Sequence, residues 1–72
     1  MKTVKTVYVV ATKDIPRQFQ MSGDVFTDDI THAGYFYEKE TAQSHVETMF
    51  NTSTHCVIPL TLTYSYPTGE VI

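Results

Sequence analysis

Cysteine is the scarcest reactive residue in this sequence: Cys56 is the only one, and tryptophan is absent. A single thiol cannot form a disulfide within the chain, and a lone thiol is typical of proteins in a reducing compartment. The apolar run after Lys2 and Lys5 extends only from Val7 to Ala11, which is too short for a secretory signal or a membrane-spanning helix. These features predict a cytoplasmic protein.

Basic residues are also few, because five Lys and Arg stand against eight Asp and Glu, for a formal net charge of −3. Nonspecific affinity for nucleic acids arises from clustered Lys and Arg. Neither residue type occurs between Val25 and Tyr37 or between His55 and Tyr66. This composition argues against a broad phosphate-binding surface, and single-stranded nucleic-acid binding through stacked aromatic rings remains a second alternative.

The length of 72 residues predicts one domain, residues 1–72. A chain of this size buries only roughly 60% of the surface that its unfolded form exposes. Its core supplies about 3 to 5 kcal/mol of stability unless a disulfide, a metal or a partner subunit adds to it. Because the sequence offers little of the first two, we expect a homodimer.

Three segments have the composition of β-strands. Val4–Thr12 is rich in β-branched residues and apolar on both faces, which is typical of a central strand. Val25–Tyr37 reads as a second strand that is interrupted in its middle. His55–Tyr66 alternates clearly between apolar and polar residues, and Pro59 predicts that it lies at a sheet edge or carries a bulge.

One segment, Glu38–Phe50, has the periodicity of an amphipathic helix. Its apolar residues Ala42, Val46, Met49 and Phe50 form a single stripe. The residues from Lys13 to Asp24 contain a proline and a Ser-Gly-Asp turn sequence, and we expect them to form a loop.

These elements predict an α+β fold of β-β-α-β order, with a three-stranded antiparallel-type sheet in the strand order 2-1-3 and one helix packed on one face. One helix covers only one face of a sheet, whereas the first strand is apolar on both. Two alternatives remain for the second face. The segment from Lys13 to Asp24 covers it, or it is an exposed patch of the kind that marks an interface.

No catalytic, cofactor or metal site is predicted, so we expect a protein that is not an enzyme. The potential ligands lack the short intervals of structural zinc sites, and neighbouring residues of a strand point to opposite faces. The adjacent carboxylates diverge in an extended segment, whereas acid–base catalysis needs two that converge. The cysteine lies on an apolar stripe and reads as a small buried hydrophobe. The residues considered are His32, His45, His55, Cys56, Asp28 and Asp29.

The sequence resembles small uncharacterised proteins encoded by bacteriophages and prophages in three segments: the opening YVV strand, the segment GYFYEKETAQSHVE and the closing alternating strand. In these proteins, a strand ending in Phe or Tyr continues into a short helix rich in Glu and Lys, here Tyr35 to Val46. The resemblance implies an accessory factor in the host cytoplasm that binds and modulates or inhibits a host protein. It transfers no functional residues.

The sequence therefore predicts a small non-catalytic protein-binding or regulatory module. An alternative is a small-molecule-binding or enzymatic subunit whose site forms between chains, with His32, His45 or Asp28. The predicted protein contacts are apolar and aromatic, because such residues are typical of interfaces. They are Phe19, Met21, Tyr35, Tyr37, Tyr64 and Tyr66.

Overall fold

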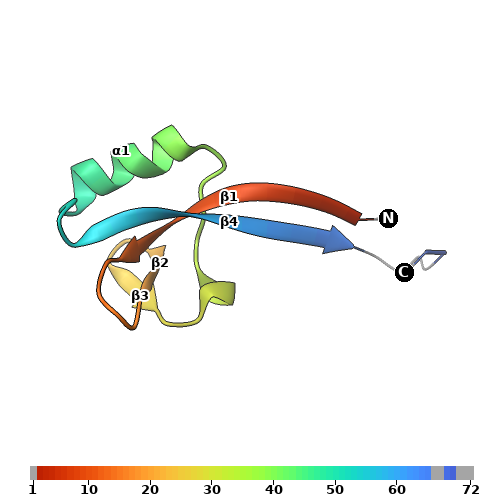
Figure 1. The fold of residues 1–72 in the computed structure, drawn as a ribbon, viewed down its shortest axis with the longest axis horizontal. Coiled ribbons are helices and arrows are strands. Elements are labelled where there is room, and N and C mark those ends of the chain that lie inside the picture. The colour runs from red at the N-terminus through yellow and green to blue at the C-terminus, as the bar shows by residue number, and fades with distance from the viewer. Residues whose placement is uncertain (1, 66–67, 70–72) are drawn as a thin grey trace.

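The computed structural model describes residues 2–65 and 68–69 of the chain (Figure 1). In a twisted antiparallel sheet, the helix lies on one side of the two long strands, and the two short strands of the sheet and a 3-10 turn lie toward the other side. In chain order the elements are β1 (Lys2–Thr12), β2 (Phe19–Ser22), β3 (Val25–Thr27), η1 (Ile30–His32), α1 (Lys39–Met49) and β4 (His55–Ser65).

The α+β class agrees with the prediction from sequence, but the predicted three-stranded sheet in the order 2-1-3 is wrong. The sheet has four strands in the order β3-β2-β1-β4, and all neighbours are antiparallel. The central position of β1 and the edge position of β4 are both as expected. The additional strand is β2, which lies within the segment that we expected to be a loop.

The hairpin of β2 and β3 was missed because its strands are too short to show a pattern. Phe19 and Met21 alternate with polar residues over only four positions, close to a proline that suggested a loop. The predicted turn is correct in position and joins the two strands. Gly23 adopts a φ of 54°, in the left-handed region that glycine enters without a steric penalty. The register shifts between Gln20 and Ser22, as in a β-bulge.

The long second strand expected over residues 25–37 is wrong beyond Thr27. Asp29 instead caps η1 by accepting a hydrogen bond from the Thr31 amide, and the chain then crosses the sheet. This segment pairs with the sheet at one position, where Tyr8 and Phe36 exchange two backbone hydrogen bonds of 2.8 Å. An aspartate that satisfies a local amide favours a turn over a strand, which explains the interruption.

The backbone hydrogen bonds of β1 alternate between its two neighbours. The amide and carbonyl of Tyr8 face Phe36, and the amide of Thr12 donates to Gln18, so even-numbered residues of β1 point away from β4. Tyr8 is opposite Pro59 in the unbroken register with β4. Pro59 therefore lies in a pair without hydrogen bonds, and its missing amide faces the outer edge of β4. The proline consequently removes no hydrogen bond from the ladder.

Helix α1 buries Ala42 and Val46 against β1 and β4, as its apolar stripe predicted. Met49, a predicted member of the stripe, is 61% exposed, and Phe50 follows the helix as its half-buried C-cap. The helix ends before the stripe completes another turn. No helix in the described part of the chain combines the length and apolar character needed to cross a membrane.

Both faces of the sheet are covered where its strands lie together. Val10 is fully buried on the side of the helix, and Val7, Val9 and Ala11 are fully buried on the opposite side. Residues of the η1 segment lie against β4 on that opposite side, where Ile30 shares a hollow with Leu60. The alternative of an open second face is therefore wrong over the body of the sheet.

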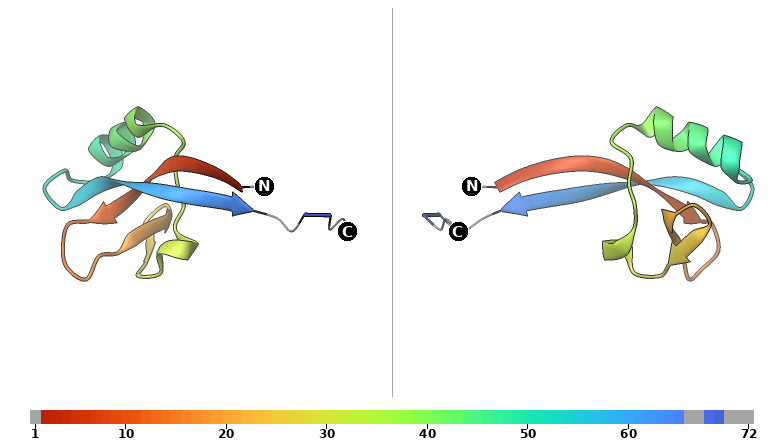
Figure 2. Two further views of the ribbon diagram at one scale, coloured as in Figure 1. Left: turned by 45° about the vertical axis from the view of Figure 1, so that its right-hand side comes forward. Right: turned by 180° about the vertical axis from the view of Figure 1, so that it is seen from behind.

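The N-terminal half of β1 and the C-terminal half of β4 extend together beyond the rest of the molecule (Figure 2). This protruding ribbon pairs Lys2–Thr6 with Thr61–Ser65, and all of its residues except Leu62 are exposed. Neither the helix nor β2 reaches it, so among the described residues its two edges have no paired strand, and the Tyr37 ring lies on Lys5 at one of its faces. The most accessible part of the sheet thus lies where the two long strands leave the core.

Candidate functional site

Three tyrosines lie on the same side of the sheet with a lysine and a leucine: Tyr64 on the protruding ribbon, and Tyr35 and Tyr37 on the segment that crosses beside β1. Tyr64 lies opposite Thr3 and Leu62 opposite Lys5, so these residues share the face away from the helix. Phe36 contacts His45 of the helix, and its neighbours in the extended segment point to the opposite face. We call this surface the tyrosine face; it consists of Lys5, Tyr35, Tyr37, Leu62 and Tyr64.

The tyrosine face is held by contacts among its own side chains. The Lys5 Nζ lies 4.2 Å from the centroid of the Tyr37 ring, a favourable cation–π arrangement. The rings of Tyr35 and Tyr37 meet edge to face with centroids 5.6 Å apart. These contacts reduce the number of conformations that the exposed rings adopt.

The rings nevertheless remain accessible, because Tyr35 is 40%, Tyr64 49% and Tyr37 60% exposed. A hollow adjoins Tyr35 and Leu62, and residues of η1 and β4 complete its lining. Its volume of about 240 Å³ lies below the roughly 300 to 1,000 Å³ typical of small-molecule sites. The hollow is therefore better suited to a protruding apolar side chain than to a complete small ligand.

The structure brings together three of the six residues predicted to contact a protein, namely Tyr35, Tyr37 and Tyr64. Phe19 is half-buried opposite Ala11, and Met21 is exposed at the β-bulge of β2, so neither belongs to the tyrosine face. The sixth, Tyr66, lies outside the described residues.

Lys5 and Leu62 were missed as members of the surface because their proximity depends on strand register. The sequence did contain one indication of this surface. Lys5 is charged, whereas Val7 and Val9, the next residues on the same face of the strand, are apolar. A charged residue at that position indicates that the strand leaves the core. Only the pairing of β1 with β4 places this lysine opposite Leu62.

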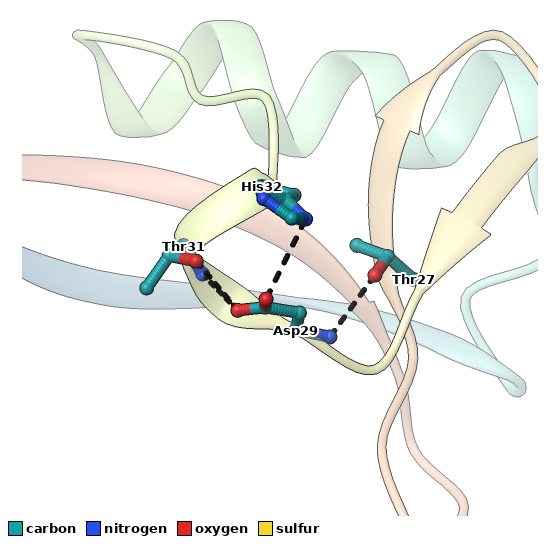
Figure 3. A network of polar contacts seen from close by, with 4 residues as sticks. All are labelled: Thr27, Asp29, Thr31 and His32. Carbon is teal, nitrogen blue, oxygen red and sulfur yellow. Dashed lines mark hydrogen bonds and ion pairs between the residues drawn. The ribbon is translucent and has the colours of Figure 1, made fainter.

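His32 and Asp29 form a local polar network at η1 (Figure 3). The hydroxyl and the amide of Thr31 both donate to Oδ1 of Asp29, at 2.6 and 3.0 Å, and His32 Nδ1 lies 3.5 Å from Oδ2. The hydrogen bonds from Thr31 and the nearby imidazole lower the pKa of Asp29. Because this network stabilises the turn and is exposed to solvent, we attribute a structural role to it.

The other two histidines lie on either side of Phe50. The His55 ring stacks on Phe50 with centroids 4.6 Å apart, and the His45 ring meets Phe50 edge to face at 5.7 Å. Phe26 packs against Phe50 and His55, so an aromatic cluster closes this end of the core. Both histidines thus contribute to packing between the helix and the sheet.

Buried Gln20 links this cluster to the β2–β3 turn. Its Nε2 donates to the Gly23 carbonyl at 2.6 Å and lies 3.2 Å from Nε2 of His45. The carbonyl fixes the orientation of the amide, because a flipped amide would place two acceptors together. The imidazole therefore accepts at Nε2 and carries its hydrogen on Nδ1, which ties the helix to the hairpin.

Cys56 is half-buried, and its Sγ accepts a hydrogen bond of 3.5 Å from Arg17. The same guanidinium nitrogen donates to the Thr12 carbonyl at 2.9 Å. Arg17 thus holds the end of the 13–18 connection against β1 and β4. Within residues 2–65 and 68–69, the His, Cys, Asp and Glu side chains form no group of three that could hold a metal ion.

No protein-family model matches this chain, and no curated protein or solved structure shows significant similarity to it. The resemblance to small phage proteins stays a prediction.

Proposed function

We propose that the chain is a non-catalytic protein-binding module and that the tyrosine face is its contact surface. The observation that carries the proposal is that Tyr35, Tyr37 and Tyr64 lie on one side of the sheet at exposures between 40% and 60%, with Tyr35 beside an apolar hollow. Tyrosine is enriched in protein interfaces because its ring buries a large apolar area and its hydroxyl forms hydrogen bonds.

The restrained side chains of the tyrosine face support a role in binding. A side chain that is already restrained loses less conformational entropy when a partner binds. The contact of Lys5 with Tyr37 and the edge-to-face pair of Tyr35 and Tyr37 provide this restraint. A matching partner presents an apolar side chain to the hollow and an acceptor group near Lys5.

The test compares three forms of the full chain in affinity capture from an extract of the source cell. They are the wild type, the double variant Tyr37→Ala/Tyr64→Ala, and the control Met49→Ala. Met49 is a suitable control because it is 61% exposed on the helix, close to the 60% of Tyr37, but lies on the other side of the sheet. The captured protein is then purified and titrated calorimetrically with each form.

The proposal predicts a partner that binds the wild type and the Met49→Ala control equally and the double variant at least about tenfold more weakly, since each interface tyrosine is worth about 1 kcal/mol or more. Equal binding of all three forms would show that the tyrosine face is not the contact surface. A labelled single-stranded oligonucleotide, bound by the wild type and lost with the double variant, would instead identify a nucleic-acid-binding face.

A further inference from the structure

The protruding ribbon leaves one edge of β1 without a neighbour among the described residues. Even-numbered residues of β1 point their amides and carbonyls away from β4, as the bonds of Tyr8 and Thr12 show. The pairing with β4 is unbroken from Lys2 to Thr12, so the same orientation holds for Lys2, Val4 and Thr6. Their amides and carbonyls form an open row of donors and acceptors.

The outer edge of β4 is interrupted at the base of the ribbon, where Pro59 removes a donor, which is a common protection of edge strands. Beyond Pro59, the β4 edge contains no proline over Thr61–Ser65. The open edge of β1 contains no proline. A ribbon of two strands is only marginally stable in water, and a third strand with further side-chain packing stabilises it.

We propose that the open edge of β1 binds the same edge of a second copy of this chain, antiparallel, with a two-fold axis through Val4. Val4 then pairs with Val4 of the partner, and Lys2 pairs with the partner's Thr6 at both ends. Each of these three pairs exchanges two backbone hydrogen bonds, because Lys2, Val4 and Thr6 each point the backbone amide and carbonyl to this edge. The two ribbons become one four-stranded sheet in the order β4-β1-β1-β4.

The side chains fit this register. Val4, which is 61% exposed in the single chain, meets its own copy across the axis, where β-branched pairs are favourable. Each Lys2 is opposite a threonine, and each Lys5 is opposite Thr3, so no two like charges face each other. A register shifted by one residue would instead place the two-fold axis between Val4 and Lys5 or between Thr3 and Val4. Each residue with an outward-facing amide and carbonyl would then lie opposite a residue whose groups point to β4, and the backbone hydrogen bonds could not form.

The charge at the end of the edge also fits a second copy. The segment that contains Phe36 runs antiparallel to β1 beside Tyr8. Glu38, two residues after Phe36, therefore lies toward Thr6, two residues before Tyr8. Thr6 is the residue that faces the partner's Lys2. The acidic start of the helix of one copy thus lies toward the basic end of the other. The interface contains opposite charges at both ends and apolar contact at its centre.

A two-fold axis through a pair of antiparallel strands is perpendicular to the sheet, so it keeps both tyrosine faces on the same side. The two copies of Tyr37 and Tyr64 then belong to one continuous surface. The self-association does not depend on the proposed binding of another protein, since it uses an edge and that binding uses a face. The two proposals can fail separately.

The test uses proline substitutions on the two edges of the same ribbon. Val4→Pro removes an amide that faces the proposed interface and is not bonded to β4. Thr63→Pro is the matched control, because Thr63 pairs with Val4 and its amide faces the outer edge of β4, where Pro59 already lies. Light scattering across a concentration series measures the mass of each form, and circular dichroism verifies that each is folded.

The proposal predicts a concentration-dependent mass approaching twice 8.2 kDa for the wild type and for Thr63→Pro. In Val4→Pro the dissociation constant rises about tenfold or more, since two hydrogen bonds are lost by symmetry. A wild type that stays monomeric throughout the series, or a Val4→Pro variant that dimerises as the wild type does, would overturn the proposal.

Hydrogen exchange of the wild type provides a second measurement that needs no variant. The amides of Thr3 and Lys5 bond to β4 and are protected at every concentration. The amides of Val4 and Thr6 gain protection only as the dimer forms. Exchange of Val4 and Thr6 that does not change with concentration would likewise overturn the proposal.

Discussion

Truncation of Val9 tests whether the chain itself covers the face of the sheet that lies away from the helix. Val9 is fully buried on that face. Val9→Ala removes two methyl groups, each worth roughly 0.8 kcal/mol of transfer free energy, and leaves part of their volume empty. With this cavity contribution we expect a loss of about 2 to 3 kcal/mol in the free energy of unfolding.

Such a loss is large for a domain with about 3 to 5 kcal/mol of total stability. Urea unfolding followed by circular dichroism measures it, and with a slope of about 1 kcal/mol/M the midpoint falls by about 2 M or more. Thermal unfolding gives an independent value, because 1 kcal/mol shifts the midpoint by about 4 to 8 °C in a domain of this size.

Val4→Ala is the internal control for this prediction, since it makes the same chemical change in the same strand at a residue that is 61% exposed. At a concentration where the chain is monomeric, we expect a change below about 0.5 kcal/mol. If Val9→Ala were as mild as Val4→Ala, the conclusion that the chain covers both faces of β1 would be refuted.

Three further predictions concern the connections around the sheet. Gly34→Ala places a Cβ 2.6 Å from a backbone carbonyl oxygen of β2, and chemical denaturation should show a loss of about 1 to 3 kcal/mol. Gln20→Leu removes the buried amide that bonds the Gly23 carbonyl and His45 and should lower stability by about 0.5 to 1.5 kcal/mol in the same assay. Thr31→Ala removes the hydroxyl that chiefly lowers the pKa of Asp29. An NMR titration should show that this pKa rises toward 3.8 without reaching it, because the hydrogen bond from the backbone amide of residue 31 remains. Since the folded pKa is lowered, this carboxylate stabilises the wild type above pH 3.8 and loses its effect as pH falls through the folded pKa.

The long elements of the fold could be predicted from sequence because their patterns extend over many residues. The two apolar faces of the first strand indicated its central position, and Pro59 indicated the edge position of the last. The short strands β2 and β3 could not be predicted, because four and three residues are too few to establish a period. Their formation depends on pairing with β1 and on the turn at Gly23.

The candidate site could be predicted only in its residue types. Clustered tyrosines indicated an aromatic surface, but its membership depends on the register between strands that are far apart in sequence. That register places Tyr64 on the same face as Lys5, and the crossing at Phe36 adds Tyr35 and Tyr37. The expected contribution of Phe19 disappeared because β2 places it against the core.

Pro59 has a consequence for how large an assembly of this chain can become. It divides the outer edge of β4, and His55 at the start of that edge already donates its amide to Asn51. A strand arriving there cannot pair continuously past Pro59, and the uninterrupted outward-facing stretch beyond it is Thr61–Ser65. Because the proposed pairing of β1 with its own copy is two-fold symmetric, both β1 edges are occupied after one addition, and that contact does not propagate to further molecules.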